Sequence, residues 1–258
     1  MVELIGLSMT AFSGKSIKDF KEWAGKTQKL GFDFIELLSE WPHYLTKASY
    51  RDFAEIVEGY GMKITVHAPF SDINIGAFNE KIRRAALEVL RETIEVAAEM
   101  NALVVTIHPG HCSPLSIKHR EKYLEIHRKS LRKIAAWSEE FGIKVGLENM
   151  PRFPILDAQS CERLAELVED IDIGVTLDVG HLNTTTRNFD RFIQLLGNRI
   201  VHLHLHDNRG DKDEHLPLGE GTVPWAQVIP KLPKVTWSLE VGGIESARKS
   251  LEFLRSLH

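Results

Sequence analysis

The chain alternates repeatedly between a short apolar run and a longer segment whose apolar residues recur every three or four positions. Short apolar runs are typical of buried strands, and a period near 3.6 residues is typical of amphipathic helices. The predicted strands are Leu4–Leu7, Phe32–Leu37, Lys63–His67, Leu103–His108, Lys144–Glu148, Ile173–Asp178, Ile200–His204 and Val235–Glu240. This alternation predicts a parallel sheet whose strands are joined by helices.

The predicted helices are clearest where they are long, at Asn79–Met100 and Arg120–Phe141. The others are Ser16–Leu30, Ser49–Gly59, Cys161–Val168, Phe189–Leu196, Trp225–Leu232 and Glu245–Leu257. Gly31, Gly61 and Gly142 each follow a helix and precede a strand, where a left-handed residue commonly ends a helix.

Eight strand–helix pairs in 258 residues predict one domain, residues 1–258, folded as an α/β protein of the (β/α)8 TIM-barrel type. The alternative is a doubly wound open sheet. It is disfavoured because the first strand is followed by SMTAFSGK, which lacks the glycine-rich phosphate loop of such folds.

The formal net charge of −4 gives no overall basic surface of the kind that nucleic-acid-binding proteins use. No basic segment followed by a long apolar run opens the chain, and no apolar stretch approaches the ~20 residues needed to cross a membrane. Cys112 and Cys161 lie far apart in different contexts, which favours two free thiols in a reducing compartment. We therefore expect a cytoplasmic protein with no membrane partner.

Six successive predicted strands, the third to the eighth, end in a histidine or a carboxylate. These residues are His67 in VHAPF, His108 in IHPGH, Glu148 in GLENM, Asp178 in LDVGH, His204 in HLHLHD and Glu240 in SLEVGG. Three more follow in loops: His181, Asp213 and His215. The carboxyl ends of barrel strands are where active sites are built. Imidazoles and carboxylates without thiolates suit Zn²⁺, Mn²⁺ or Co²⁺, so the pattern predicts a divalent-metal site.

This constellation resembles the xylose-isomerase-like barrels, a superfamily that includes sugar isomerases, ketose 3-epimerases and the zinc enzyme endonuclease IV. Likeness to endonuclease IV implies three zinc ions. The first ion would be held by His67, His108 and Glu148. Glu148 would bridge to a second ion, which is also held by Asp178, His204 and Glu240. The third ion would be held by His181, Asp213 and His215. Likeness to the 3-epimerases implies one metal, usually manganese, held by Glu148, Asp178, His204 and Glu240. The expected cofactor is thus zinc or manganese, one to three ions per chain.

The first hypothesis is a metal-dependent isomerase or epimerase acting on a sugar or sugar phosphate. Glu148 and Glu240 would move a proton next to a carbonyl that the metal polarises. The segment ELLSEWP resembles the sugar enzymes and carries no arginine for a phosphate backbone. The resemblance implies substrate contacts at Glu36, Phe70, His111, His181 and Arg209. A solvent-facing or capping role for Glu36, and lid packing for Phe70 and Trp41, remain open alternatives.

The second hypothesis is an endonuclease IV-type hydrolase that cuts duplex DNA at an abasic site. The complete set of nine residues favours it, because a one-metal epimerase does not need all of them. If Glu148 bridges two metal ions, it is a poorer base than a free carboxylate, which weakens the isomerase hypothesis. A third possibility is a non-catalytic barrel that binds a metal or metabolite. We expect His202 and His206 to be neighbours of the site and not ligands, and His43, His119 and His127 to be surface residues.

Overall fold

The computed structural model describes residues 4–257, and these form a closed barrel of parallel strands in sequential order from β1 to β8. The strands are β1 (Leu4–Ser8), β2 (Phe34–Leu38), β3 (Lys63–His67), β4 (Val105–Ile107), β5 (Val145–Glu148), β6 (Gly174–Asp178), β7 (Ile200–Leu205) and β8 (Thr236–Leu239). β1 pairs with both β2 and β8, which closes the sheet. The predicted TIM barrel is confirmed.

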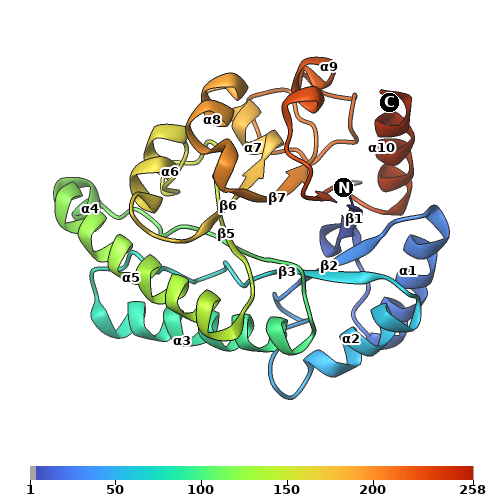
Figure 1. The fold of residues 1–258 in the computed structure, drawn as a ribbon, viewed down its shortest axis with the longest axis horizontal. Helices are drawn as coiled ribbons and strands as arrows, with labels where there is room; N and C mark the ends of the chain where they lie inside the picture. The colour runs from blue at the N-terminus through green and yellow to red at the C-terminus, as the bar shows by residue number, and fades with distance from the viewer. Residues whose placement is uncertain (1–3, 258) are drawn as a thin grey trace.

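Helices surround the barrel (Figure 1). They are α1 (Ile17–Leu30), α2 (Tyr50–Gly59), α3 (Glu80–Glu99), α4 (Pro114–Lys118), α5 (Arg120–Phe141), α6 (Cys161–Val168), α7 (Val179–Thr184), α8 (Phe189–Leu196), α9 (Trp225–Val228) and α10 (Ile244–Ser256). Short 3₁₀ turns are η1 (Met9–Ala11), η2 (Gly197–Arg199) and η3 (Ile229–Lys231). None of the helices in this part of the chain is both long and apolar enough to cross a membrane.

Local sequence explains several helix ends. Ser16 and Asp19 form a capping box at the start of α1, and Gly31 ends that helix in the left-handed region. Gly142 ends α5 in the same way. The predicted helix Trp225–Leu232 is shorter: α9 ends at Val228 and a 3₁₀ turn continues to Lys231, because Pro230 lacks the N–H that an α-helix needs.

Two helices were not expected from the sequence. The α7 helix begins directly after β6, and the Asp178 side chain caps it by accepting the backbone N–H of His181. The α4 helix begins at Pro114, a favoured first helical residue, behind a Ser113–Ser116 capping box. Both are single-turn helices in loops at the carboxyl ends of strands, so no repeating apolar pattern marks them.

The inner wall of the barrel is polar. Thr106 on β4 and Thr176 on β6 meet across the interior at 2.9 Å, and Glu36, His202 and Ser238 are fully buried. Alternate strand residues face the helices and form the apolar core. They include Leu7, Ile35, Leu37, Val66, Ile107, Leu147, Leu177, Leu203, Leu205 and Leu239. The interiors of such barrels are usually filled with branched apolar side chains. In this barrel, hydrogen bonds hold many of the inward-facing side chains in place.

The middle of β1 shows how tightly the barrel is filled. A Cβ atom at Gly6 would lie 2.2 Å from ring carbons of Phe34, which is fully buried on β2. The phenyl ring therefore occupies the space that a side chain at position 6 would take, and the missing side chain is a packing requirement.

We predict that Gly6→Ala lowers the free energy of unfolding by about 1–3 kcal/mol, because the added methyl must displace Phe34 or the strand. Gly59→Ala is the matched control: no atom lies within 4 Å of its Cβ position at the end of α2. Urea unfolding of both variants is the measurement. Equal stability of the two variants would contradict the packing described here.

Candidate metal centre

The carboxyl ends of β3 to β8 bring the predicted residues together at one mouth of the barrel. Four groups of potential metal ligands are present, and within each group the ligand atoms all lie within 4.8 Å of one another. They are His67, His108 and Glu148; Glu148, Asp178 and His204; Glu36, His202 and His204; and His181, His206, Asp213 and His215. The first three of these groups share residues. Glu240 lies one residue past β8, with an Oε1 atom 3.8 Å from His204 Nδ1. Every residue of the predicted set of nine therefore lies in or beside one connected cluster.

Glu148 is the centre of the first two groups. It is the last residue of β5 and is 1 % exposed. Its Oε2 lies 3.0 Å from His108 Nε2 and 3.4 Å from His67 Nε2, and its Oε1 lies 2.8 Å from His204 Nδ1. Three imidazole nitrogens from three strands thus converge on one carboxylate.

The tautomers of these rings are constrained by backbone carbonyls. The Nδ1 atom of His67 lies 2.8 Å from the Ala68 carbonyl oxygen, and the Nδ1 atom of His181 lies 2.8 Å from the Asn149 carbonyl oxygen. A carbonyl only accepts, so Nδ1 carries the hydrogen. In the neutral ring the Nε2 lone pair then points at a carboxylate. Such an arrangement is stable only with a positive charge between the two atoms, either a proton or a metal ion.

His204 is held from both sides. Its Nδ1 faces Glu148, and its Nε2 lies 3.1 Å from Glu36 Oε1. The same Glu36 atom lies 3.2 Å from His202 Nε2, whose Nδ1 lies 2.6 Å from Thr236 Oγ1. A carboxylate behind a metal-binding imidazole fixes the ring and increases its basicity.

Glu36 therefore lies beneath the site floor. It is fully buried and contacts two histidines, whereas the sequence predicted a substrate contact. We interpret Glu36 as the residue that orients His204. The signal that the sequence offered was a carboxylate at an inward-facing strand position, which places it inside the barrel.

Asn149, which the sequence analysis did not select, fixes the spacing between two of the strand ends. Its side chain accepts the Asp178 N–H and donates to the Asp178 carbonyl, both at 2.9 Å. The ends of β5 and β6 are thereby locked together, with Glu148 and Asp178 side by side.

Burial and neighbouring charges act in opposite directions on the acids. Burial would raise the pKa of the Glu148 and Asp213 carboxyls, but His204 next to the first and His181 next to the second hold each pKa below its ordinary value. Burial would likewise raise the pKa of the Asp178 carboxyl, but His181 and His206 hold it below its ordinary value. These carboxylates are ionised at neutral pH, as metal ligands must be.

The imidazoles respond unequally. Burial lowers the pKa of His108 to about 4. Burial also opposes protonation of His204 and His215, but carboxylates hold the His204 pKa well above its ordinary value and raise that of His215 to about 9. The cluster thus attracts positive charge strongly, and a divalent cation competes with protons for the same nitrogen atoms.

The residues fit a divalent metal. The donors are nitrogen and oxygen atoms, as Zn²⁺ and Mn²⁺ prefer. Asp178 Oδ2 is buried without a hydrogen-bond partner, although buried polar atoms are rarely left without one. Asp178 forms one group of potential ligands with Glu148 and His204, and an ion held by that group would satisfy this atom.

The expected substrate-contacting residues lie at the rim. The Phe70 ring stacks on His108 with centroids 4.6 Å apart, and Glu40 accepts the N–H groups of Phe70 and Ser71. His111 is half-buried and forms a bridge to Leu156, and the Arg209 guanidinium contacts Glu214. His181 lies in the cluster itself.

His127 corrects an expectation. It was expected on the surface, but it is fully buried and its Nε2 accepts the Gly110 N–H at 3.1 Å. Its Nδ1 lies 3.4 Å from Asp157, which also receives a bidentate pair from Arg163 at 2.8 and 2.9 Å. The helical position of His127 on the inner face of α5 was the overlooked signal.

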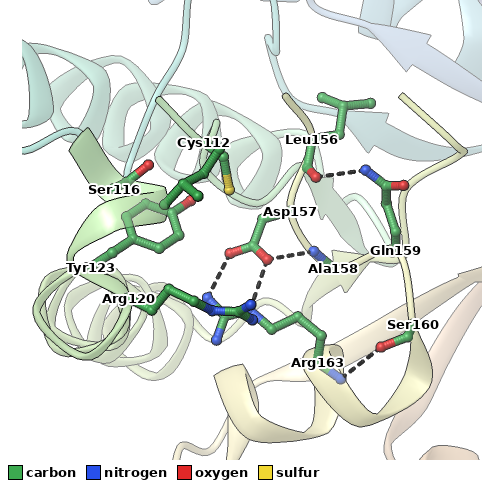
Figure 2. Close-up of a pocket in the computed structure, with 11 residues that line it drawn as sticks. Cys112, Ser116, Arg120, Tyr123, Leu156, Asp157, Ala158, Gln159, Ser160 and Arg163 are labelled. Carbon is green, nitrogen blue, oxygen red and sulfur yellow. Dashed lines mark hydrogen bonds and ion pairs between the residues drawn. The ribbon is translucent and has the colours of Figure 1, made fainter. Parts of the chain in front are cut away.

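Figure 2 shows that Asp157 and Arg163 line a pocket of about 290 Å³, together with Cys112 and Tyr123. The pocket lies beside the bridge between the β4 and β5 loops and contains none of the metal-site residues. Its ion pair anchors the β5 loop. Cys112 and Cys161 are both free thiols.

The comparisons agree with this geometry. Residues 25–257 match the model of the family described as xylose isomerase-like TIM barrel, so the chain belongs to that family. The uncharacterized protein MJ1311 of Methanocaldococcus jannaschii is 37% identical over 97% of this chain and 87% of its own length.

Two further similarities point in different functional directions. The crystal structure of a D-tagatose 3-epimerase-like protein superposes with a TM-score of 0.89 at 36% identity, covering 98% of this chain and 96% of that one. The probable endonuclease 4 of Mycobacterium bovis is 28% identical over 75% of this chain and 77% of its own length.

We predict that Glu36→Gln weakens zinc binding at the Glu148–His204 group about 10–100-fold, because a neutral amide no longer orients and polarises His204. Competition with a chromophoric chelator measures the affinity. Thr236→Val is the matched control, since it removes only the hydrogen bond on the far side of His202. An unchanged affinity in folded Glu36→Gln protein would exclude the orienting role.

The Asp157 pair predicts a pH dependence. Burial would raise the pKa of Asp157, but His127 and Arg163 hold it below its ordinary value. Its contribution to stability is therefore complete above about pH 4, the ordinary pKa of an aspartate, and disappears as pH falls further. We expect Asp157→Asn to cost about 2–3 kcal/mol at pH 7, and less at pH 3.

The matched control is Glu166→Gln, because Glu166 contacts the same guanidinium and is 46 % exposed. An exposed pair of this kind contributes about 0–1 kcal/mol. Urea unfolding at both pH values is the measurement, and a pH-independent difference for Asp157→Asn would contradict the assignment.

Proposed function

We propose that this protein is a divalent-metal-dependent epimerase or isomerase of a ketose or ketose phosphate, with one to three zinc or manganese ions per chain. The observation that carries the proposal is the placement of two carboxylates around one imidazole. Glu148 and Glu240 come from β5 and β8, and their Oε1 atoms lie 2.8 and 3.8 Å from His204 Nδ1. Both side chains are nearly buried.

Two carboxylates from different sides of a barrel mouth suit proton transfer at a carbon next to a carbonyl. One removes the proton from one face and the other returns it to the opposite face. A bound divalent ion would stabilise the negative charge that develops on the substrate oxygens. Phe70 forms an apolar wall beside His108, which suits the non-polar face of a sugar and limits access of water.

The rim charges favour a small substrate over a DNA backbone. In the loop after β2, Glu40 is tied to the backbone of Phe70 and Ser71. Arg209 follows the β7 histidines in the loop after the strand, and its guanidinium contacts Glu214. A phosphate backbone is bound chiefly through unpaired lysines and arginines, so carboxylates at the rim oppose it. The similarity to the D-tagatose 3-epimerase-like structure supports the same conclusion.

A second candidate is hydrolysis of DNA at an abasic site. One observation favours it: His67, His108, His181, Asp213 and His215 all join the cluster, and the four-residue epimerase site does not need them. The similarity to probable endonuclease 4 supports this candidate.

We predict that the protein incubated with manganese in heavy water incorporates deuterium next to the carbonyl of at least one ketose or ketose phosphate. Glu240→Gln should reduce the exchange at least 100-fold, because the carboxylate that moves the proton is lost. Mass spectrometry of the recovered sugars is the measurement.

Glu220→Gln is the matched control, since Glu220 is an exposed carboxylate paired with Lys249 outside the cluster. The metal content of each variant is determined in parallel, which separates loss of the base from loss of the ion. Absence of exchange on every ketose by metal-loaded protein, together with cleavage of an abasic duplex, would replace the epimerase proposal with the hydrolase.

A further inference from the structure

We propose that His206 is a metal ligand and that, with His181, Asp213 and His215, it forms a metal position closed by four protein side chains. We call this group the outer position. The sequence suggested that His206 is only a neighbour of the site. In the structure it is the first residue past β7 and is fully buried, and its Nε2 lies 3.1 Å from Asp178 Oδ1 and 3.3 Å from Asp213 Oδ1 without the geometry of a hydrogen bond to either.

The four side chains are close enough to share one ion, because their ligand atoms all lie within 4.8 Å of one another. Asp213 oxygens lie 3.2 Å from His181 Nε2, 3.2 Å from His215 Nε2 and 3.3 Å from His206 Nε2. Ligand atoms bound to one zinc at about 2.0–2.1 Å are themselves about 3.3 Å apart in a tetrahedron. The His206 and His215 rings also stack, with ring centroids 4.0 Å apart.

Backbone contacts leave the Nε2 atoms free to bind. Nδ1 of His181 donates to the Asn149 carbonyl, and Nδ1 of His215 donates to the Glu240 carbonyl at 2.9 Å. The nearest acceptor for His206 Nδ1 is the Asp207 carbonyl at 3.4 Å. In this tautomer the Nε2 lone pairs of His181 and His215 face Asp213, and that of His206 lies between Asp178 and Asp213. A cation among these atoms removes the repulsion.

The chain is built to place the His206 ring here. A Cβ atom at Gly180 would lie 2.1 Å from that ring, so only glycine leaves room for it. The next residue, Asp207, is fully buried and accepts the backbone N–H of Val223 and the Trp225 indole N–H. These bonds fix the backbone on which His206 sits.

A position with four protein ligands is typical of structural zinc, because catalytic zinc keeps one place for water or substrate. The group His67, His108 and Glu148 offers three side chains and so has room for a further ligand. We therefore assign the reaction to the Glu148 side. The outer position fastens the loop that carries Asp213 and His215 to β6 and β7. This assignment holds for either activity and does not rest on the proposed function.

The direct test uses the wild-type protein. Crystals soaked in zinc chloride are measured on both sides of the zinc absorption edge. We expect an anomalous peak about 2.0–2.1 Å from His206 Nε2 and equally close to His181, Asp213 and His215. A peak bound by the other three residues, with a water in the fourth place and His206 beyond 2.8 Å, overturns the proposal. Absence of a peak at this position also overturns it.

Variants separate ligation from hydrogen bonding. His206→Gln keeps a hydrogen-bonding side chain but is a poor zinc ligand, and His206→Cys supplies a thiolate ligand. After dialysis against a weak chelator, we expect His206→Gln to retain about one zinc fewer per chain, or to bind that zinc at least tenfold more weakly. His206→Cys should restore it. His127→Gln is the control, because His127 is an equally buried histidine outside the cluster. Wild-type zinc content and affinity in folded His206→Gln protein would refute the proposal.

Discussion

Carboxylates and imidazoles neutralise one another inside the mouth of this barrel, and much of the architecture serves that arrangement. Glu36, Glu148 and Asp178 are fully or almost fully buried, and each faces at least one histidine ring. An unpaired charge at these positions is strongly destabilising, so the strands must present both partners in register. The closed sheet meets this requirement, because six neighbouring strand ends meet at one mouth of the barrel.

Polar side chains deeper inside the barrel must also be paired with one another. From Thr236, contacts pass through His202 to Glu36 and on to His204 beside Glu148. A side chain in such a chain has two partners and one orientation. Branched apolar side chains, which usually fill such a barrel, fix only the shape of its interior. The hydrogen-bonded side chains in this barrel also fix the direction of each ring nitrogen. The site is thereby preorganised for a cation.

The sequence was sufficient for the fold and for placing the predicted site residues at one edge of the sheet, and the reason is periodicity. Strand ends in a parallel barrel share one edge, so His67, His108 and Glu148 were placed correctly relative to the sheet without any tertiary information. The helical period likewise located α3 and α5. The single-turn α7 was missed because a helix so short shows no period.

Side-chain direction inside the barrel was less accessible. Glu36 was expected to face substrate, yet it faces His202 and His204 on strands that are remote from β2 in sequence. His206 was expected to be a bystander, because a strand pattern does not reveal where a residue just past the strand turns. Gly180 decides that direction, and this contact between α7 and the end of β7 exists only in the folded chain.

The two candidate reactions draw on the same core and diverge at its edges. Glu148, Asp178, His204 and Glu240 suit either a proton transfer or the stabilisation of a phosphoryl group, since both need charge held near a polarised oxygen. What separates the reactions is which metal positions remain open and which charges line the rim. An outer position closed by His206 removes one open place, and the Glu40 carboxylate makes the rim less attractive to a polyanion. Both features lie outside the four shared residues, so we infer that the loops around this common core decide which reaction it supports.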